Sequence, residues 1–460
     1  MTATPLPGNV GRTDPTRRDE PAVQVNARRA ATASFVGGTL EYYDFFLYGS
    51  ASALVFNKVF FPGIDPYLGQ ILAMATIGIG YVVRPVAAAV IGHYGDRIGR
   101  KQMLLLTLIL MGTATTLIGA LPTTAQIGAL APILLVLLRV LQGISAAGES
   151  VGAATLSLEA APDHKRAFYT SWVNTGSVAG IMLASLAFLV VSFLPEQALL
   201  TWGWRVPFLA SVIVVAIGLW IRLKLVESEV FKDAKEHVEH SELRNELPIV
   251  TVFKRHPLTL LTVVGIQLFA VVSSVFSAFG LSYGANTLKV PGAVMLSLTI
   301  VTAALGIGFQ PLAGVLADRV GRKPVFVVGN VLCAIAVFAY FWSLTTGVVP
   351  LMFLTSILFM TIAYGLVNPL APLMIAELFE TEIRYSGAAF GSQLGLIVTG
   401  FAPAIAAAVV QPGPTGWVPV AALTAACSLI SALVVLFAVR ETYRTATKDL
   451  ARASAVTVPA

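Results

Sequence analysis

The sequence predicts an all-α membrane protein with twelve transmembrane helices, arranged as two six-helix halves related by pseudo-two-fold symmetry. The first reason is composition: 56% of the 460 residues are hydrophobic, only 12% are charged and the mean hydropathy is +0.81. A soluble domain has about 25% charged residues. The second reason is a succession of apolar stretches of about 18 residues or more, long enough to cross a hydrocarbon core of about 30 Å. The third is an internal repeat, which indicates two homologous halves.

The apolar stretches are expected to be helices. An open sheet edge cannot be satisfied in lipid, and the ten-residue alternation of a membrane barrel does not occur. Six stretches precede a charge-dense segment in the middle of the chain and six follow it. Their expected bounds are 32–56, 70–92, 103–121, 131–157, 167–194, 206–223, 257–284, 293–316, 325–345, 349–377, 385–410 and 416–439.

The repeat is a basic loop that occurs at residues 92–101 (GHYGDRIGRK) and again at residues 314–323 (GVLADRVGRK). Six of the ten positions are identical, and each copy joins one apolar stretch to the next. A second echo links residues 159–166 (EAAPDHKR) with residues 377–384 (ELFETEIR), each with Glu and Arg seven residues apart. Both halves therefore carry the same pair of charged motifs.

The basic residues predict the orientation. With both termini in the cytoplasm, 25 of the 30 Lys and Arg residues fall on that side and three, Lys58, Arg205 and Lys289, on the other. The remaining two lie inside apolar stretches. This asymmetry predicts a multi-pass protein of the bacterial cytoplasmic (inner) membrane with both termini cytoplasmic. The formal charge of +6 then reflects orientation, and we expect no nucleic-acid partner.

The expected organisation has five parts. Residues 1–30 form a disordered cytoplasmic tail, 31–224 the N-terminal half, 225–256 a cytoplasmic linker with a short amphipathic helix, 257–440 the C-terminal half and 441–460 a second cytoplasmic tail. The two cysteines, Cys333 and Cys427, lie in separate apolar stretches. They form no metal or disulfide pattern, so we expect small buried hydrophobes and neither a metal nor a cofactor.

The paired motifs predict a latch at the cytoplasmic side. Clusters of opposite charge at helix ends can bond across the two halves in one conformation and separate in another. The alternative is that the basic residues only set the topology. The expected gating residues are Asp96, Arg97, Arg100, Glu159 and Arg166 in the first half and Asp318, Arg319, Arg322, Glu377 and Arg384 in the second.

The two basic loops resemble the signature of the major facilitator superfamily, and the resemblance covers residues 31–440. Four further motifs, in the same order, resemble its metabolite:proton symporter family: GTLEYYDFFLYG at 38–49, RP at 84–85 before the first basic loop, RVLQG at 139–143 followed by GE at 148–149, and WGWRVPF at 202–208. The resemblance implies a secondary transporter that works by alternating access.

Charged residues inside the membrane are costly and usually face a water-filled cavity and a partner. Glu41 and Asp44 lie about one helical turn apart, with Tyr48 one turn further on the same face. Counted from their helix starts, Asp44 is about 16 Å deep and Arg139 about 12 Å deep, so they can meet near the midplane. We expect Asp44, Glu41 and Arg139 to couple transport to protons, a role that the superfamily resemblance also implies. The alternative is a permanent structural ion bridge.

Arg84 is the other unusual charge. Its planar guanidinium can bind a carboxylate with two hydrogen bonds, which predicts an anchor for an organic anion. The alternative is a structural pair with Glu41 or Asp44. The C-terminal half carries no charge between its loops and is expected to supply shape and hydrogen bonds. The expected substrate-binding residues are Arg84, Tyr48, Gln142, Trp172, Asn174, Gln267, Asn368 and Gln393.

Other functions lack their motifs. The chain has no phosphate-binding loop for an ATP-driven pump and no repeated pore segment for a channel, and its five histidines all lie in or beside cytoplasmic loops, so we expect no enzyme.

We expect proton-coupled uptake of a small organic acid or zwitterionic carboxylate by a protein that functions as a monomer in the lipid bilayer. The alternative is a proton-coupled exporter of small metabolites or drugs. Gly176 and Gly180 on the fifth span lack the proline typical of drug antiporters, which favours symport. The residues leave the individual substrate open.

Overall fold

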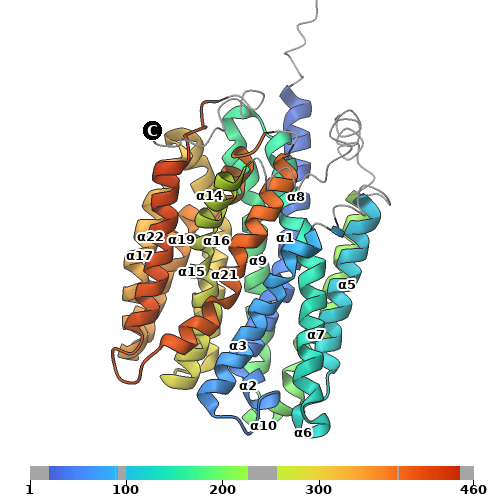
Figure 1. The fold of residues 1–460 in the computed structure, drawn as a ribbon, viewed down its shortest axis with the longest axis vertical. Helices are drawn as coiled ribbons and strands as arrows, with labels where there is room; N and C mark the ends of the chain where they lie inside the picture. Colours follow the sequence, from blue (N-terminus) through green and yellow to red (C-terminus); the bar gives the residue numbers. More distant parts are fainter. Residues whose placement is uncertain (1–19, 89, 92–99, 226–255, 381–382, 446–460) are drawn as a thin grey trace, which may run out of the picture.

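The computed structural model describes residues 20–88, 90–91, 100–225, 256–380 and 383–445. The regular structure of these residues is entirely helical, without a strand. The helices lie side by side in an elongated bundle, and the described start and end of the chain lie at the same end of it (Figure 1). We call this the terminal end and the other the opposite end. The predicted all-α architecture is confirmed.

The N-terminal half supplies six spans from the helices that follow one another along residues 20–225. Short helices lie at the turns between them. The elements are α1 (Glu20–Leu54), α2 (Phe56–Val59), α3 (Pro66–Val82), α5 (Arg100–Ala120), α6 (Thr124–Ile127), α7 (Leu130–Ser145), η1 (Ala146–Gly148), α8 (Glu149–Ala160), η2 (Asp163–Lys165), α9 (Arg166–Ser192), α10 (Glu196–Ala198), η3 (Leu199–Gly203) and α11 (Arg205–Leu225).

The C-terminal half supplies the other six spans, two of which change helix type along their length. The elements are α14 (Pro257–Gln267), η4 (Leu268–Ala270), α15 (Val271–Ser274), η5 (Val275–Gly280), η6 (Tyr283–Thr287), α16 (Gly292–Val320), α17 (Arg322–Thr346), α18 (Val349–Ser356), η7 (Ile357–Ala363), α19 (Tyr364–Val367), α20 (Ala371–Glu377), α21 (Arg384–Val409) and α22 (Val418–Ala438). Of these, η5, η6 and η7 are π-helical.

Length and hydropathy identify the membrane-crossing helices. Within the described residues, eight helical stretches are long and apolar enough to cross a membrane, and a ninth is formed if the pair Glu196–Gly203 and Arg205–Trp220, bent by 43°, counts as one span. Two shorter apolar helices, Leu105–Ala120 and Leu130–Ser145, belong to the predicted third and fourth spans. The remaining predicted span is α1, whose first turns carry charged residues.

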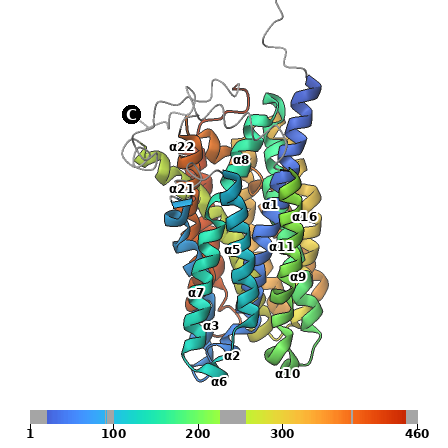
Figure 2. The same ribbon diagram turned by 90° about the vertical axis from the view of Figure 1, so that its right-hand side faces the viewer.

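The two halves meet along two pairs of helices. Helix α9 packs against α16, and α3 packs against α21 (Figures 1 and 2). Inside the N-terminal half, α3 and α7 cross at a very short distance: a Cβ on Gly143 would lie 2.2 Å from the carbonyl oxygen of Gly80. Glycine is required there because any side chain would separate the two helices.

Two predicted boundaries shift. Helix α1 begins at Glu20, so residues 20–30 extend the first helix and are not part of the tail expected over 1–30. Ala27 and Ala31 pack against Ala161 and Tyr169, and alanine is the best helix former, which explains a helix without an apolar run. At the other end, residues 441–445 of the expected tail are ordered against the bundle. The expected linker of 225–256 lies outside the described residues except at its two end positions.

Candidate functional site

A cavity lies between the two halves near the middle of the bundle, with a volume of about 100 Å³. One water needs only about 10–15 Å³, so the space can hold a small solute with its water. Its lining contains no charged side chain among the described residues. Aromatic rings and uncharged polar groups from both halves form it. The principal ones are Tyr42, Phe45, Tyr81, Asn174, Ser177, Gln267, Ser273, Tyr364, Asn368, Gln393 and Thr399.

Four buried charged side chains lie beside this cavity, all in the N-terminal half. Glu41 and Arg84 form an ion pair, with 3.4 Å between Oε1 and Nη1, and their side chains are 1% and 4% exposed. Asp44 and Arg139 are buried as well. Removing one member of such a buried pair is strongly destabilising, because the other charge is left without its partner.

Asp44 and Arg139 are joined through two polar side chains. The Arg139 guanidinium donates to Oε1 of Gln142 at 3.0 Å, and Nε2 of Gln142 donates to the Thr115 hydroxyl at 2.7 Å. Thr115, whose hydroxyl donates to the carbonyl of Met111 at 3.0 Å, lies next to Asp44. No ion pair within 4.0 Å links Asp44 with Arg139, although both are described. The two predicted partners are thus brought together, but through Gln142 and Thr115.

An aromatic layer separates the arginines from the cavity. The guanidinium carbon of Arg84 lies 4.0 Å from the ring centre of Phe45, and that of Arg139 lies 4.2 Å from the same centre. Arg84 also lies 4.5 Å from the centre of the Tyr81 ring. Both rings line the cavity. Cation–π contacts stabilise a buried guanidinium, so these rings hold the two charges one side chain away from the cavity.

The expected substrate-binding residues divide into two groups. Asn174, Gln267, Asn368 and Gln393 line the cavity. Arg84, Tyr48, Gln142 and Trp172 do not: Tyr48 donates to Thr76 at 2.6 Å, and Trp172 packs edge-on against Phe35. The one-turn spacing of Glu41, Asp44 and Tyr48 could not reveal this, because a helix face says nothing about which neighbours cover it.

Polar side chains of the two halves bond to one another in the cavity wall. Nδ2 of Asn174 donates to the carbonyl oxygen of Asn368 at 2.6 Å and to its Oδ1 at 3.2 Å. Nε2 of Gln393 donates to the carbonyl of Ala147 at 3.4 Å. Both bonds cross between the halves, so the groups that line the cavity also hold its two walls together.

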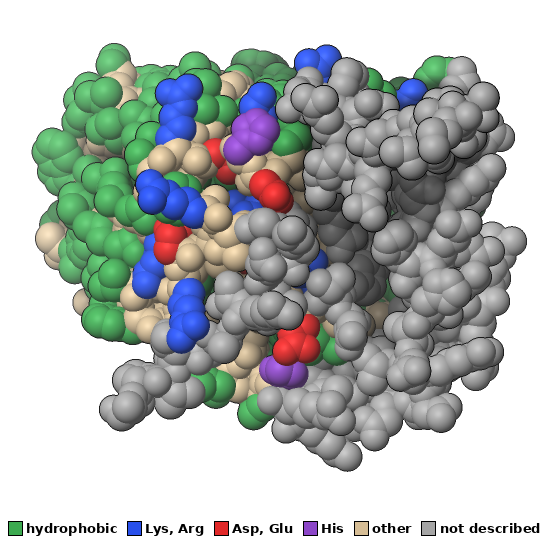
Figure 3. All heavy atoms as spheres, turned by 90° about the horizontal axis from the view of Figure 1, so that it is seen from above, with side chains coloured by type: hydrophobic (Ala, Val, Ile, Leu, Met, Phe, Trp, Pro, Cys, Tyr) green, Lys and Arg blue, Asp and Glu red, His purple; other side chains and the backbone are tan. Residues whose placement is uncertain are grey.

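At the terminal end, charged side chains gather on the described part of the surface, and hydrophobic side chains form its outer edge (Figure 3). Asp318, at the end of α16, accepts hydrogen bonds from the backbone amides of Ala167 and Phe168 at 3.0 and 2.9 Å. These amides begin α9 of the other half. A carboxylate at a helix start is favourable because it meets unpaired amides and the positive end of the helix dipole.

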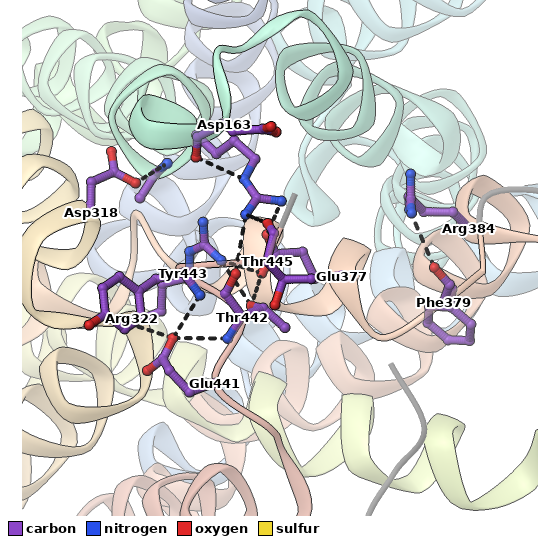
Figure 4. A network of polar contacts seen from close by, with 12 residues as sticks. Asp163, Asp318, Arg322, Glu377, Phe379, Arg384, Glu441, Thr442, Tyr443 and Thr445 are labelled. Atoms are coloured by element: carbon purple, nitrogen blue, oxygen red, sulfur yellow. Dashed lines mark hydrogen bonds and ion pairs between the residues drawn. The ribbon is translucent and has the colours of Figure 1, made fainter. Parts of the chain in front are cut away.

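Glu377 is the centre of a second contact between the halves (Figure 4). Its Oε2 lies 2.9 Å from Nη1 of Arg322, and its Oε1 lies 3.4 Å from Nη1 of Arg166 in the other half. The Thr442 hydroxyl donates to Glu377 at 2.5 Å, and Nη2 of Arg166 donates to the carbonyl of Thr445 at 2.6 Å. All three charged side chains are buried, so this cluster is a sealed junction of both halves with the C-terminal segment.

Sequence reasoning missed the C-terminal segment in this cluster. Oε1 and Oε2 of Glu441 accept from the backbone amides of Arg322 and Lys323 at 3.2 and 2.9 Å, at the start of α17 (Figure 4). The available signal was an acidic residue and a threonine directly after the last apolar stretch. The segment is predicted to be a tail because it lacks hydrophobic residues. That criterion does not detect a segment that is held by hydrogen bonds.

The structure describes only some of the other predicted gating residues. Arg384 is buried and donates from Nε to the carbonyl of Phe379 at 3.3 Å, whereas Arg319 is exposed. Asp96 and Arg97 lie outside the described residues, as do the side chains of Arg100 and Glu159. Asp318, Arg322 and Glu377 of the second-half copy form contacts at the junction, and the role of both copies as a latch stays a prediction.

Contacts between the halves also occur at the opposite end. The Tyr67 hydroxyl donates to the carbonyl of Ala408 at 2.8 Å, and Nδ2 of Asn286 donates to the carbonyl of Ala53 at 2.9 Å. The cavity thus lies between two sets of inter-half contacts. A bundle of two halves, with a central polar cavity and inter-half contacts at both ends, is the architecture of a secondary transporter.

Comparisons with known proteins identify the family. Residues 30–244 match the family model for sugar (and other) transporters, and residues 291–459 match the Major Facilitator Superfamily model. The chain is 38% identical over 425 residues to the shikimate transporter of Escherichia coli, covering 92% of this chain and 97% of that one. The chain belongs to the major facilitator superfamily, and it is a multi-pass membrane transporter of small metabolites, not an enzyme.

Two further relatives extend this result. A glycine betaine/proline/ectoine/pipecolic acid transporter from Dickeya dadantii is 34% identical over 402 residues, covering 85% of this chain and 79% of that one. Among solved structures, a proton:xylose symporter of the superfamily bound to 6-bromo-6-deoxy-D-glucose has a TM-score of 0.71 at 16% identity, covering 94% of this chain and 99% of that chain. This likeness concerns the fold.

Proposed function

We propose that this transporter is a proton-coupled symporter that takes up a small organic acid or a zwitterionic carboxylate. The observation that carries the proposal is the group of four buried charges, Glu41, Asp44, Arg84 and Arg139, next to an uncharged cavity. Charges in a membrane interior are costly, and they mark proton and ion pathways in transporters. Two carboxylates that could hold a proton, Glu41 and Asp44, are therefore buried together with the two arginines that contact the cavity-lining ring of Phe45.

Asp44 and Glu41 are the proposed proton-binding groups. A neighbouring arginine favours a carboxylate's ionised form, and loss of water favours its protonated form. Hydration of the site from alternate sides would then load and release a proton. Gln142 and Thr115, which are hydrogen-bonded to Arg139 in turn, lie between it and Asp44 and would hold the proposed proton site in place.

Arg84 is the proposed anchor for the substrate carboxylate. In this conformation the Arg84 guanidinium is paired with Glu41, with 3.4 Å between Nη1 and Oε1. Protonation of Glu41 would weaken that pair and leave the arginine available to another carboxylate, provided that the Phe45 or Tyr81 ring moves aside. The relatives' names support a carboxylate class, since shikimate, glycine betaine and proline all carry one. Proton binding and substrate binding would thus share one arginine.

The terminal end is proposed to face the cytoplasm of a bacterial cell, because most basic residues lie on that side of the predicted topology. The junction around Glu377 and Asp318 would then be the cytoplasmic latch, which closes when the transporter opens outward. One chain contains both halves and the cavity between them, so we propose that a monomer carries out the cycle.

Transport by the purified protein in proteoliposomes tests this function. Labelled shikimate, proline and glycine betaine are offered with the outside more acidic, with equal pH and with the outside more alkaline. Symport requires accumulation that the inward proton gradient increases and a protonophore abolishes. Accumulation driven by the reversed gradient would instead identify the antiporter, and accumulation indifferent to both gradients would exclude proton coupling.

A further inference from the structure

The tenth span is interrupted beside the cavity. Helix α19 ends at Val367 and α20 begins at Ala371, and the residues between them form turns. The cause is in the sequence NPLAP at 368–372, which places prolines at 369 and 372. Proline has no amide hydrogen, so it cannot donate to the carbonyl four residues earlier. Pro372 therefore leaves the carbonyl of Asn368 without its helical donor.

The missing donor comes from the other half of the protein. Nδ2 of Asn174, on α9, lies 2.6 Å from the carbonyl oxygen of Asn368. This is a short hydrogen bond between two residues separated by 194 positions. Membrane helices tolerate proline where a neighbouring side chain satisfies the freed backbone group. Here that neighbour belongs to the half that moves relative to the carbonyl.

The acceptor side of this bond is held in place by its own half. The Tyr364 hydroxyl donates to Oδ1 of Asn368 at 3.1 Å, and Nδ2 of Asn368 donates to Oε1 of Gln310 at 3.4 Å. Both partners lie in the C-terminal half. Movement of the two halves therefore leaves Asn368 fixed and takes Asn174 away from it.

The bond also lies in the wall of the substrate cavity. Asn174, Asn368 and Pro372 all line it, and the two asparagines are only 9% and 7% exposed. A buried carbonyl that loses its donor costs about 1–3 kcal/mol unless another donor replaces it. During the transport cycle the natural replacement is a donor on the molecule inside the cavity.

We propose that the substrate carries a hydroxyl or N–H donor that replaces Asn174 at the carbonyl of Asn368, so that the site selects hydroxylated acids and N–H-bearing zwitterions over fully N-methylated ones. The inference rests on the proposed transport of a small carboxylate and narrows its substrate class. A quaternary ammonium group has no hydrogen to donate, so betaine-type compounds would leave the carbonyl unsatisfied.

Binding to the full-length protein in detergent, measured by isothermal titration calorimetry, tests the inference with two matched pairs. Shikimate is compared with cyclohex-1-ene-1-carboxylate, which has the same ring and carboxylate without hydroxyls. Proline is compared with N,N-dimethylproline, which lacks the N–H donors. Loss of one hydrogen bond to a buried group corresponds to at least about a fivefold weaker affinity, and we expect the donor-bearing member of at least one pair to bind better by that factor.

Three variants test whether the preference for donor-bearing probes arises at the carbonyl of Asn368. Pro372→Ala restores an amide hydrogen four residues after Asn368, so the donor preference should fall several-fold. Asn174→Ala removes the competing donor, so the donor-bearing probe should bind at least as tightly as it does to the wild type. Asn286→Ala is the matched control: Asn286 also donates to a backbone carbonyl of the other half, that of Ala53, but it does not line the cavity. The Asn286→Ala protein should prefer the donor-bearing probes by the same factor as the wild type.

Equal affinities within both pairs would overturn the inference, as would a preference that Pro372→Ala leaves unchanged. Binding of none of the four probes would overturn it together with the proposed substrate class. Proton-driven uptake is scored separately. Uptake without donor preference contradicts the inference alone, whereas donor-selective binding without proton-driven uptake contradicts the proposed symport alone.

Discussion

At the level of the cavity, the two halves of this transporter differ in the kind of polarity they bury. Among the described residues, the N-terminal half holds Glu41, Asp44, Arg84 and Arg139, whereas the C-terminal half holds only uncharged amides and hydroxyls. Buried charges require charged or strongly polar partners, whereas uncharged polar groups need only hydrogen bonds.

The backbones of both halves are interrupted at some spans. In the N-terminal half the fourth span changes from α7 through the 3-10 turn η1 to α8, whereas α9 runs unbroken over 27 residues, from Arg166 to Ser192. The seventh and tenth spans contain π-helical turns, and the tenth also has a proline-induced break. Such departures are frequent at functional sites, because they free backbone groups for other partners. Among the described residues only the N-terminal half buries charges at this level, which supports the proposal that proton chemistry belongs to that half and substrate hydrogen bonding to the other.

The largest expected effect comes from Asp44→Asn, which removes a titratable group and keeps its shape. Accumulation driven by a pH gradient in proteoliposomes should fall to the background level, because the proposed proton site is lost. Exchange of labelled for unlabelled substrate should persist, since exchange needs no net proton movement. The control is Glu380→Gln in the other half, which removes an exposed carboxylate outside the cavity and should retain gradient-driven accumulation. Undiminished accumulation in the Asp44 variant would refute the assignment of proton chemistry to this half.

A second large effect is expected at the terminal junction. Glu377→Gln leaves Arg166 and Arg322 buried without their carboxylate, and loss of one member of a buried pair costs about 3–5 kcal/mol. The conformation with a closed terminal end should lose stability. Labelling of single cysteines placed in the lining near that end should become faster than in the parent protein. Arg319→Gln is the matched control, because Arg319 is exposed, and its labelling should not change. Unchanged labelling in the Glu377 variant would show that the charged loops set the topology and do not gate the transporter.

The next effect separates the two roles of Arg84. As a substrate anchor, its charge-assisted bonds contribute about 1.5–3 kcal/mol, so Arg84→Ala should weaken affinity about 10- to 150-fold. Arg84→Lys should recover only part, because lysine lacks the planar fork. Glu41→Gln removes the competing carboxylate and should leave substrate affinity equal or higher. If Glu41→Gln and Arg84→Ala weaken binding equally, the pair is structural and the substrate does not reach Arg84.

The smallest effect is expected at Trp172, which the sequence favoured as a cavity residue. Trp172→Phe keeps an aromatic ring against Phe35, and Trp172 is not among the residues that line the cavity. Substrate affinity should change by less than about twofold, since the change lies within the few tenths of a kcal/mol typical away from special sites. A larger loss of affinity would place the substrate against Trp172 itself and contradict the lining described above.

The sequence by itself determined the fold class, the twelve spans, the duplicated halves and the charged motifs at helix ends. These follow from hydropathy, spacing and repetition, which are properties of the chain read along its length. It also predicted Asn174, Gln267, Asn368 and Gln393 as substrate-binding residues. All four line the cavity, and their binding role stays a prediction.

Only the tertiary structure decided how these residues meet. It set Gln142 and Thr115 between Asp44 and Arg139, placed Phe45 between both arginines and the cavity, and brought Glu441 and Thr442 to the terminal junction. Pairing across the halves depends on the rotation and depth of each helix against its neighbours. Those quantities are fixed by side-chain packing between segments far apart in the chain, such as Asn174 and Asn368, and no local pattern encodes them.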